Sequence, residues 1–126
     1  MKTVVSTTSA PEAIGPYSQA IKANGFLFLS GQIPLNRESG RIEAVDVVGQ
    51  TRQVMENIEA VLGSQGLLFS DVVKTTIFLT NLDDFTRVND IYGAYFKEDP
   101  PARSTVQVGG LPKGAKVEIE VVAVLP

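Results

Sequence analysis

The sequence lacks cysteine and histidine, two residue types that carry much of enzyme chemistry. Without cysteine there is no disulfide, no thiolate nucleophile and no sulfur-ligated metal. Without histidine the chain has neither the commonest general base nor the commonest transition-metal ligand. These absences exclude Ser-His-Asp triads, His-Glu-x-x-His zinc sites and zinc deaminase sites. Any chemistry must come from carboxylates, Arg, Lys, Tyr, hydroxyls and backbone groups.

Long apolar runs and a surplus of positive charge are also missing. The longest apolar runs, 26–29 and 121–125, are far too short to span a bilayer. The net charge is −3, which argues against nucleic acid as the main partner, because binding to phosphates needs an excess of cations. The first eleven residues contain no apolar stretch typical of a signal peptide. We therefore expect a cytoplasmic protein with no membrane partner.

The remaining composition is that of one globular domain. The chain has 126 residues, of which 44% are hydrophobic and 20% charged. No internal repeat, low-complexity tract or charge block divides it, so residues 1–126 are interpreted as a single domain.

Hydrophobic periodicity predicts six strands and two helices. The helices follow apolar stripes over 47–62 and 85–96. Asn24-Gly25 between two apolar runs indicates a hairpin. The order β-β-β-α-β-α-β-β predicts an α+β fold, with two helices on one face of a mixed sheet. The predicted strands are 3–6, 20–23, 26–30, 72–80, 104–108 and 116–125.

Several predicted strands are apolar on both alternating sets of side chains. Phe26 and Phe28 alternate with Leu27 and Leu29, for example. Because two helices cover only one face of a sheet, the other face must be buried by something outside the chain, most simply by further copies. We therefore predict a closed homo-oligomer with pockets at the subunit boundaries.

Glu120 is the carboxylate with the most informative position. It lies in the middle of the last predicted strand between apolar neighbours, where we expect desolvation to favour its neutral form. A carboxyl group in that state suits general acid or base catalysis. Glu118, nearer the start of the strand, is expected to reach water. A solvated Glu120, or an ion pair with Lys74 or Lys116, is the structural alternative.

Arg103 follows a rigid Pro100-Pro101-Ala102 corner. Its guanidinium offers two parallel donors that match a carboxylate, although most arginines simply lie on the surface. Asn89 borders the apolar stripe of the second helix, where a capping or interface role is the simpler interpretation.

Two loop positions are also candidates for binding. Tyr17 follows Gly15-Pro16 and either presents its hydroxyl to a ligand or packs over the sheet. Gly31 comes after Ser30 at the end of a strand. Its missing Cβ either lets a ligand approach the backbone or serves a turn.

Five ordered motifs extend over essentially the whole chain. They are Gly15-Pro16-Tyr17-Ser18-Gln19-Ala20, Leu29-Ser30-Gly31-Gln32-Ile33-Pro34, Val88-Asn89-Asp90-x-Tyr92, Pro101-Ala102-Arg103-Ser104 and Val117-Glu118-Ile119-Glu120. In this order they resemble the motifs of the RidA (YjgF/YER057c) family. The resemblance implies a trimer with a chorismate-mutase-like fold and clefts between its subunits.

The resemblance implies hydrolytic deamination of reactive enamines and imines to 2-oxo acids and ammonia, without a cofactor or metal. The substrates would be 2-iminobutanoate and 2-iminopropanoate, which pyridoxal-phosphate enzymes release. By matching position, Arg103 would bind the substrate carboxylate and Glu120 would activate water. Tyr17 and the backbone at Ser30 and Gly31 would hold the ligand.

Thr105 departs from the family pattern, because many relatives carry Cys there. We expect this position to contribute shape and main-chain contacts to the substrate. Two other functions remain as alternatives. A non-catalytic trimer that binds 2-oxo acids would use the same arginine. RNA cleavage fits poorly with a net charge of −3 and no histidine.

Overall fold

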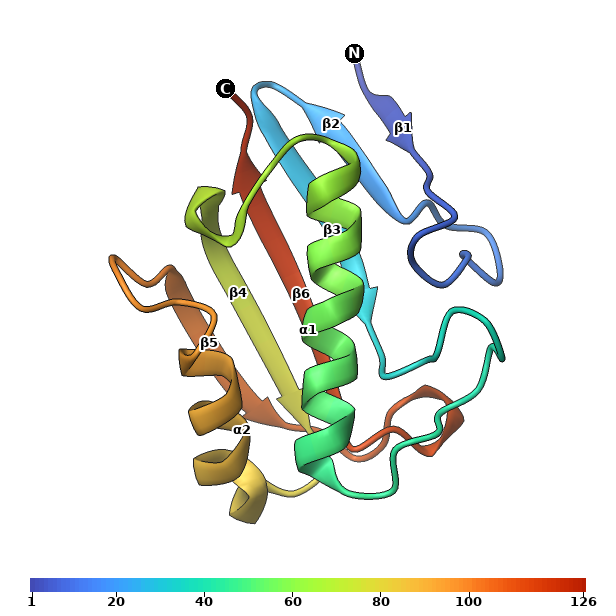
Figure 1. Ribbon diagram of the computed structural model, residues 1–126, viewed down its shortest axis with the longest axis vertical. Coiled ribbons are helices and arrows are strands. Elements are labelled where there is room, and N and C mark those ends of the chain that lie inside the picture. The colour runs from blue at the N-terminus through green and yellow to red at the C-terminus, as the bar shows by residue number, and fades with distance from the viewer.

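A computed structural model describes residues 1–126, with two helices lying across one face of a six-stranded sheet (Figure 1). The helices are α1 (Val47–Ser64) and α2 (Phe85–Gly93). The predicted fold class and element order are confirmed. The strands are β1 (Thr3–Val5), β2 (Ala20–Ala23), β3 (Phe26–Gln32), β4 (Val72–Leu79), β5 (Ala102–Gln107) and β6 (Val117–Val124), and the short 3₁₀ helices are η1 (Phe69–Asp71), η2 (Leu82–Asp84) and η3 (Pro112–Gly114).

The sheet is mixed, in the order β1-β2-β3-β6-β4-β5. Only β4 and β5 are parallel, and α2 lies in the crossover that connects them. The last strand, β6, is antiparallel to both β3 and β4 and occupies a central position. The carboxylates of β6 therefore lie beside segments from much earlier in the chain. Neither helix has the length and apolarity of a membrane span.

Several element boundaries differ from the sequence prediction, and three of these differences affect the site or the core. Strand β3 continues to Gln32, past a shift in its register with β6 that follows Leu29. Strand β5 begins at Ala102, because that residue pairs with Lys74, and Arg103 therefore lies inside the strand. Helix α2 ends at Gly93, a poor helix former. Phe96 nevertheless remains buried in the core.

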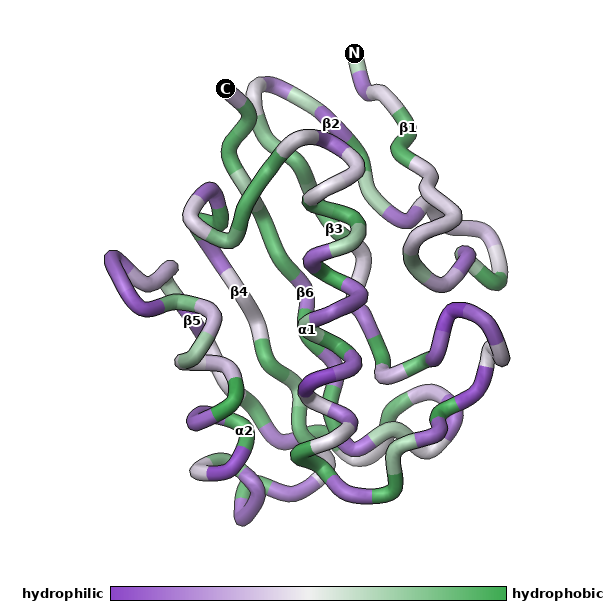
Figure 2. The backbone as a smooth tube through the Cα atoms, in the orientation of Figure 1, coloured by the Kyte–Doolittle hydropathy of each residue, from purple (hydrophilic) through white to green (hydrophobic).

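The hydrophobic core lies between the sheet and α1. Figure 2 shows hydrophobic residues recurring along α1 and running along β6 beneath it. Burying these side chains away from water is the main stabilisation of the fold. The contributors that are at most 1% exposed include Val54, Met55, Ile58, Val61 and Leu62 of α1, and Leu27, Ile77, Leu79, Val117 and Ile119 of the sheet.

No element of the chain covers the other face of the sheet. Several of its large apolar side chains are 39–60% exposed, far more than a core residue. This agrees with the expected two-sided apolar pattern, and the closed homo-oligomer remains a prediction. The side chains are Val4, Phe26, Phe28, Val106 and Val124.

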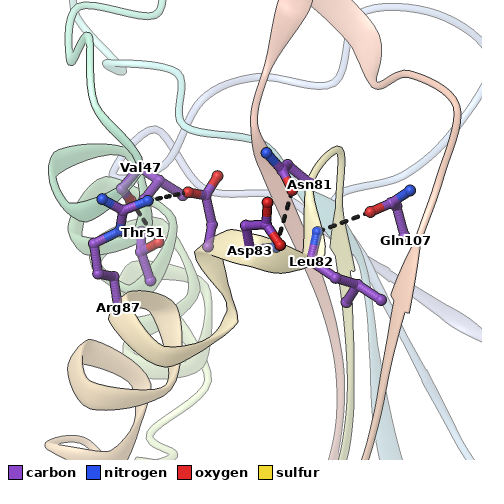
Figure 3. A network of polar contacts seen from close by, with 8 residues as sticks. Val47, Thr51, Asn81, Leu82, Asp83, Arg87 and Gln107 are labelled. Carbon is purple, nitrogen blue, oxygen red and sulfur yellow. Dashed lines mark hydrogen bonds and ion pairs between the residues drawn. The ribbon is translucent and has the colours of Figure 1, made fainter.

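A group of polar contacts sets the start of α2 (Figure 3). The Asn81 side chain accepts a hydrogen bond from the Asp83 N–H at 2.9 Å and so caps η2, the short helix that leads into α2. From β5, the Gln107 side chain accepts from the Leu82 N–H at 2.8 Å. Arg87 forms an ion pair with Asp84 in the first turn. These contacts hold α2 in register with β5.

The buried Asn57 ties the loop after β3 to α1. Its amide donates to the Leu35 carbonyl at 3.0 Å and to the Ile33 carbonyl at 3.3 Å. Asn57→Ala should lower the free energy of unfolding by about 1–3 kcal/mol, because the Leu35 carbonyl loses its side-chain partner and the Ile33 carbonyl keeps only the Leu35 N–H. Urea denaturation measures the loss. Gln53→Ala, which removes only a donor to Asn57, should cost less, and equal losses would contradict this role for Asn57.

Candidate functional site

The two strongest candidate residues lie on opposite faces of the sheet. Thr75 and Thr76 of β4 pair with Arg103 and Glu120 respectively, so the two candidates are two strands apart at nearly the same level. Their backbones are roughly 10 Å from one another. Arg103 points toward α2, whereas Glu120 points to the face that no helix covers. Within one chain they do not face the same small molecule.

Helix α2 holds the Arg103 side chain in place. The guanidinium donates to the Asn89 side-chain oxygen at 2.7 Å. Its central carbon lies 5.4 Å from the centre of the Phe85 ring and 5.2 Å from that of Tyr92, which are cation–π distances. Phe85, Asn89 and Tyr92 stand at i, i+4 and i+7, so they share one face of the helix.

No carboxylate neutralises Arg103 within the chain. The one ion pair joins Arg87 to Asp84. Asn89 accepts one of the five N–H groups of the guanidinium, which leaves donors for an anion. An adjoining cleft of about 450 Å³ includes Arg103, Asn89, Tyr92 and Pro101 in its lining. The arrangement suits a carboxylate ligand.

Tyr92 supports the arginine from the core side. Its hydroxyl shares a hydrogen bond of 2.8 Å with the buried Thr75 hydroxyl. Burial raises the pKa of Tyr92, against smaller opposite effects of this hydrogen bond and of Arg103, so the phenol is neutral at physiological pH. From the sequence, Tyr92 was expected in the apolar stripe of the second helix, and Asn89 was expected to have a capping or interface role. The spacing of the helix face was the signal that both belong with Arg103.

Thr105 lies two residues beyond Arg103 and faces the same side of β5. Its hydroxyl oxygen is buried and has no hydrogen-bond partner in the chain. Buried polar groups normally have partners, and leaving one unpaired costs about 1–3 kcal/mol. This oxygen is therefore available to a ligand or to a second chain.

The other predicted residues meet in a cleft on the uncovered side of the sheet. Its volume is about 530 Å³, and it brings together four segments of the chain. They are the loop before β2, the end of β3 with the residues that follow it, η3, and β6. The sequence indicated these residues one by one, and the antiparallel pairing of β3 with β6 places them side by side. The lining includes Tyr17, Ser30, Gly31, Lys113, Glu118 and Glu120.

Hydrogen bonds connect the Tyr17 loop to β3. The Ser30 hydroxyl donates to the Ser18 carbonyl at 2.6 Å, and the Ser30 N–H donates to the Gln19 carbonyl at 3.0 Å. Tyr17 is 53% exposed, and its hydroxyl accepts from the Ile14 N–H at 3.4 Å. The ring is therefore presented to the cleft rather than packed in the core.

The expected environments of the two β6 carboxylates are reversed, and the sequence prediction was wrong on this point. Glu118 is half-buried, while Glu120 is exposed in the single chain. A Cβ atom on Gly31 would lie 2.0 Å from a Glu118 carboxylate oxygen, so this glycine makes room for the carboxylate. Burial raises the pKa of Glu118, and the charge of Glu120 raises it further.

Glu120 has no cationic partner in the chain. The sequence left open a solvated Glu120 or an ion pair with Lys74 or Lys116. Glu120 is solvated in the single chain, and neither ion pair forms. The Lys74 ammonium instead donates to the Ser104 hydroxyl at 3.1 Å. Glu120 is thus a carboxylate at a cleft, free to act on a bound water or ligand.

Comparison with known proteins identifies the class of protein that carries this fold. A family model described as endoribonuclease L-PSP matches residues 7–125. The RutC family protein PH0854 of Pyrococcus horikoshii is 50% identical over 98% of both chains. The human 2-iminobutanoate/2-iminopropanoate deaminase is 44% identical over 98% of this chain and 90% of its own. The structure of E. coli TdcF with bound serine is 41% identical, with a TM-score of 0.93 over 98% of this chain and 99% of that one.

The chain belongs to the endoribonuclease L-PSP family, which is the RidA (YjgF/YER057c) family. The resemblance drawn from the five motifs is confirmed. Some relatives are named imine deaminases, and others carry only the RutC family name.

Removing the Glu118 charge should change how stability depends on pH. The folded state raises the pKa of this carboxyl, so the folded state binds its proton more tightly than the unfolded state does. Stability is therefore lost as pH rises through the raised pKa. The stability of Glu118→Gln relative to the wild type should increase as pH rises from the ordinary glutamate range through the raised pKa of Glu118.

Urea denaturation at several pH values measures this difference. The exposed Glu43→Gln is the matched control and should show no such trend. A difference between Glu118→Gln and the wild type that is constant with pH would contradict the assigned environment.

Proposed function

We propose that the protein hydrolyses reactive enamines and imines, such as 2-iminobutanoate and 2-iminopropanoate, to 2-oxo acids and ammonia. The observation that carries this proposal is Arg103, a guanidinium held by Asn89 over two aromatic rings with no carboxylate of its own. The deaminase names of relatives support the reaction. The serine bound to TdcF supports a small ligand that carries a carboxylate.

The proposed site needs two copies of the chain, since Arg103 and Glu120 lie on opposite faces of the sheet. We propose a homotrimer in which the uncovered, apolar sheet faces are buried between subunits. Arg103 of one copy would then face Glu120, Tyr17 and Gly31 of its neighbour, so each boundary between subunits would hold one site.

Substrate binding is assigned to the Arg103 half. Two parallel N–H groups of the guanidinium would bind the substrate carboxylate, with the side chain already oriented by Asn89 and the rings beneath it. The unpartnered Thr105 hydroxyl and nearby main chain would contact the rest of the ligand. Prior orientation matters because the substrate is short-lived and must be captured in a reactive position.

Water activation is assigned to Glu120. The carbon of an imine is already electrophilic, so hydrolysis requires a positioned water and a group that accepts its proton, rather than a nucleophilic side chain. Tyr17, with Ser30 and Gly31, would enclose the reacting carbon. The reaction that supplies such a substrate is amine chemistry of the pyridoxal-phosphate type, which releases enamines and imines as intermediates.

Two single substitutions test the assigned roles. Arg103→Ala should lose about 3–5 kcal/mol of transition-state binding, because a desolvated charge pair with the substrate is lost. Glu120→Ala should abolish ammonia release while 2-oxobutanoate still binds, which also separates an enzyme from a non-catalytic 2-oxo-acid-binding protein. Threonine dehydratase can supply the imine, whose decay is followed directly. Unchanged turnover in Glu120→Ala would refute the role of this carboxylate.

Mixing the two inactive variants tests whether the site forms between copies. In randomly mixed trimers of Arg103→Ala and Glu120→Ala, about three quarters contain both variants, and each of these has one intact site of three. Co-refolding equal amounts should therefore restore about a quarter of wild-type activity. Each variant refolded alone is the control. No recovery would show that both residues act from the same chain.

A further inference from the structure

We propose that Glu118 is the acid partner of Glu120, and that the two carboxylates share one proton, which Glu118 delivers to the substrate nitrogen. This inference rests on the proposed imine hydrolysis and adds a catalytic residue to the same site. It arises from the position of Glu118 in the cleft, which the sequence analysis did not anticipate.

The two carboxylates lie on the same face of β6 and line the same cleft. Residues i and i+2 of a strand are about 6.6 Å apart at Cα, so both side chains can reach one small ligand. They nevertheless have different surroundings, because Glu118 is half-buried and Glu120 is exposed. Two neighbouring carboxyl groups in unlike environments divide into an acid and a base.

The groups that face Glu118 favour its protonated form. On β3 the neighbour is Gly31, which leaves room for the carboxyl but offers no charge. On β4 the paired residue is the uncharged Phe78. The other titratable groups lining the cleft are Tyr17, Lys113 and Glu120, and Lys113 forms no ion pair with either carboxylate. Desolvation and the charge of Glu120 both raise the pKa of Glu118.

The protons balance over one turnover. As water attacks the imine carbon, Glu120 takes a proton from the water and Glu118 gives its proton to the nitrogen, which yields a carbinolamine. The proton then passes from Glu120 back to Glu118. In the second step Glu118 protonates the amine and the C–N bond breaks, while Glu120 takes the hydroxyl proton and the C=O bond forms. Ammonia leaves, and the proton returns to Glu118.

A positioned acid is needed in the second step, in which the amine leaves. An amine leaves only after its nitrogen has been protonated, and a general acid typically contributes about 10²–10⁴-fold to such a step. A free carboxylate at Glu118 would instead repel the carboxylate of the substrate. The half-buried, protonated form avoids this repulsion.

The test compares Glu118→Gln with the wild type over a range of pH, with Glu43→Gln as the exposed control. Glutamine keeps the size and shape of the side chain but transfers no proton. We expect kcat to fall about 100-fold with KM nearly unchanged. Because the donor is active only when protonated, wild-type kcat should fall as pH rises through the Glu118 titration, and this decline should disappear in Glu118→Gln. Glu118→Asp should recover part of the rate.

A second measurement does not depend on turnover. The side-chain carboxyl ¹³C signal of Glu118 should titrate above the ordinary glutamate range. The midpoint of this titration should be lower in Glu120→Gln, which removes the neighbouring charge. It should also be lower in Gly31→Ala, because the added Cβ forces the carboxyl group away from β3. Absence of imine hydrolysis by the wild type overturns the proposed function and this inference with it. An active wild type whose kcat and pH profile are matched by Glu118→Gln overturns only the role of Glu118.

Discussion

The rest of this molecule depends on one constraint: side chains alternate between the two faces of the sheet, and helices cover only one of these faces. Successive residues of a strand point to opposite faces. Because α1 and α2 lie on the same face, Ile119 and Val121 enter the core while Glu120, between them, faces outward. On β5 the same alternation turns Arg103 toward α2. A site that uses both polar groups must therefore be completed from outside the chain.

Helix α2 is as much a support for Arg103 as a cover for the sheet. A lone surface arginine is mobile and loses side-chain entropy when it binds. Here the guanidinium lies over two rings and donates to Asn89, so part of that entropy is already lost in the free protein. The contacts of Asn81 and Gln107 with η2 set the register between helix and strand (Figure 3). The orientation of the Arg103 side chain thus depends on how α2 begins.

The uncovered face combines an apolar surface with a polar cleft. The exposed phenylalanines and valines of β1, β3, β5 and β6 offer an area of the kind that subunit interfaces bury. The cleft at its edge contains two carboxylates of unequal burial. The difference in burial between Glu118 and Glu120 arises from Gly31 of β3, since only a residue without a Cβ leaves space for Glu118 beside this strand. Burial between subunits and acid–base chemistry are therefore compatible on one surface.

The sequence by itself determined the element order, the helix-covered face and the family, because these depend on hydrophobic periodicity and on motifs that are local in the chain. Local sequence patterns also indicated four residues as site candidates: Tyr17, Ser30, Gly31 and Glu120. These patterns did not show that the four residues line one cleft. Only the tertiary structure decided which β6 carboxylate is buried, since that depends on Gly31 of a strand some 90 residues earlier in the chain. It likewise decided that Asn89 holds Arg103 and that Arg103 and Glu120 face apart. The burial of these side chains and their interaction partners depend on residues of neighbouring strands and helices. A local sequence pattern does not show which residues these are.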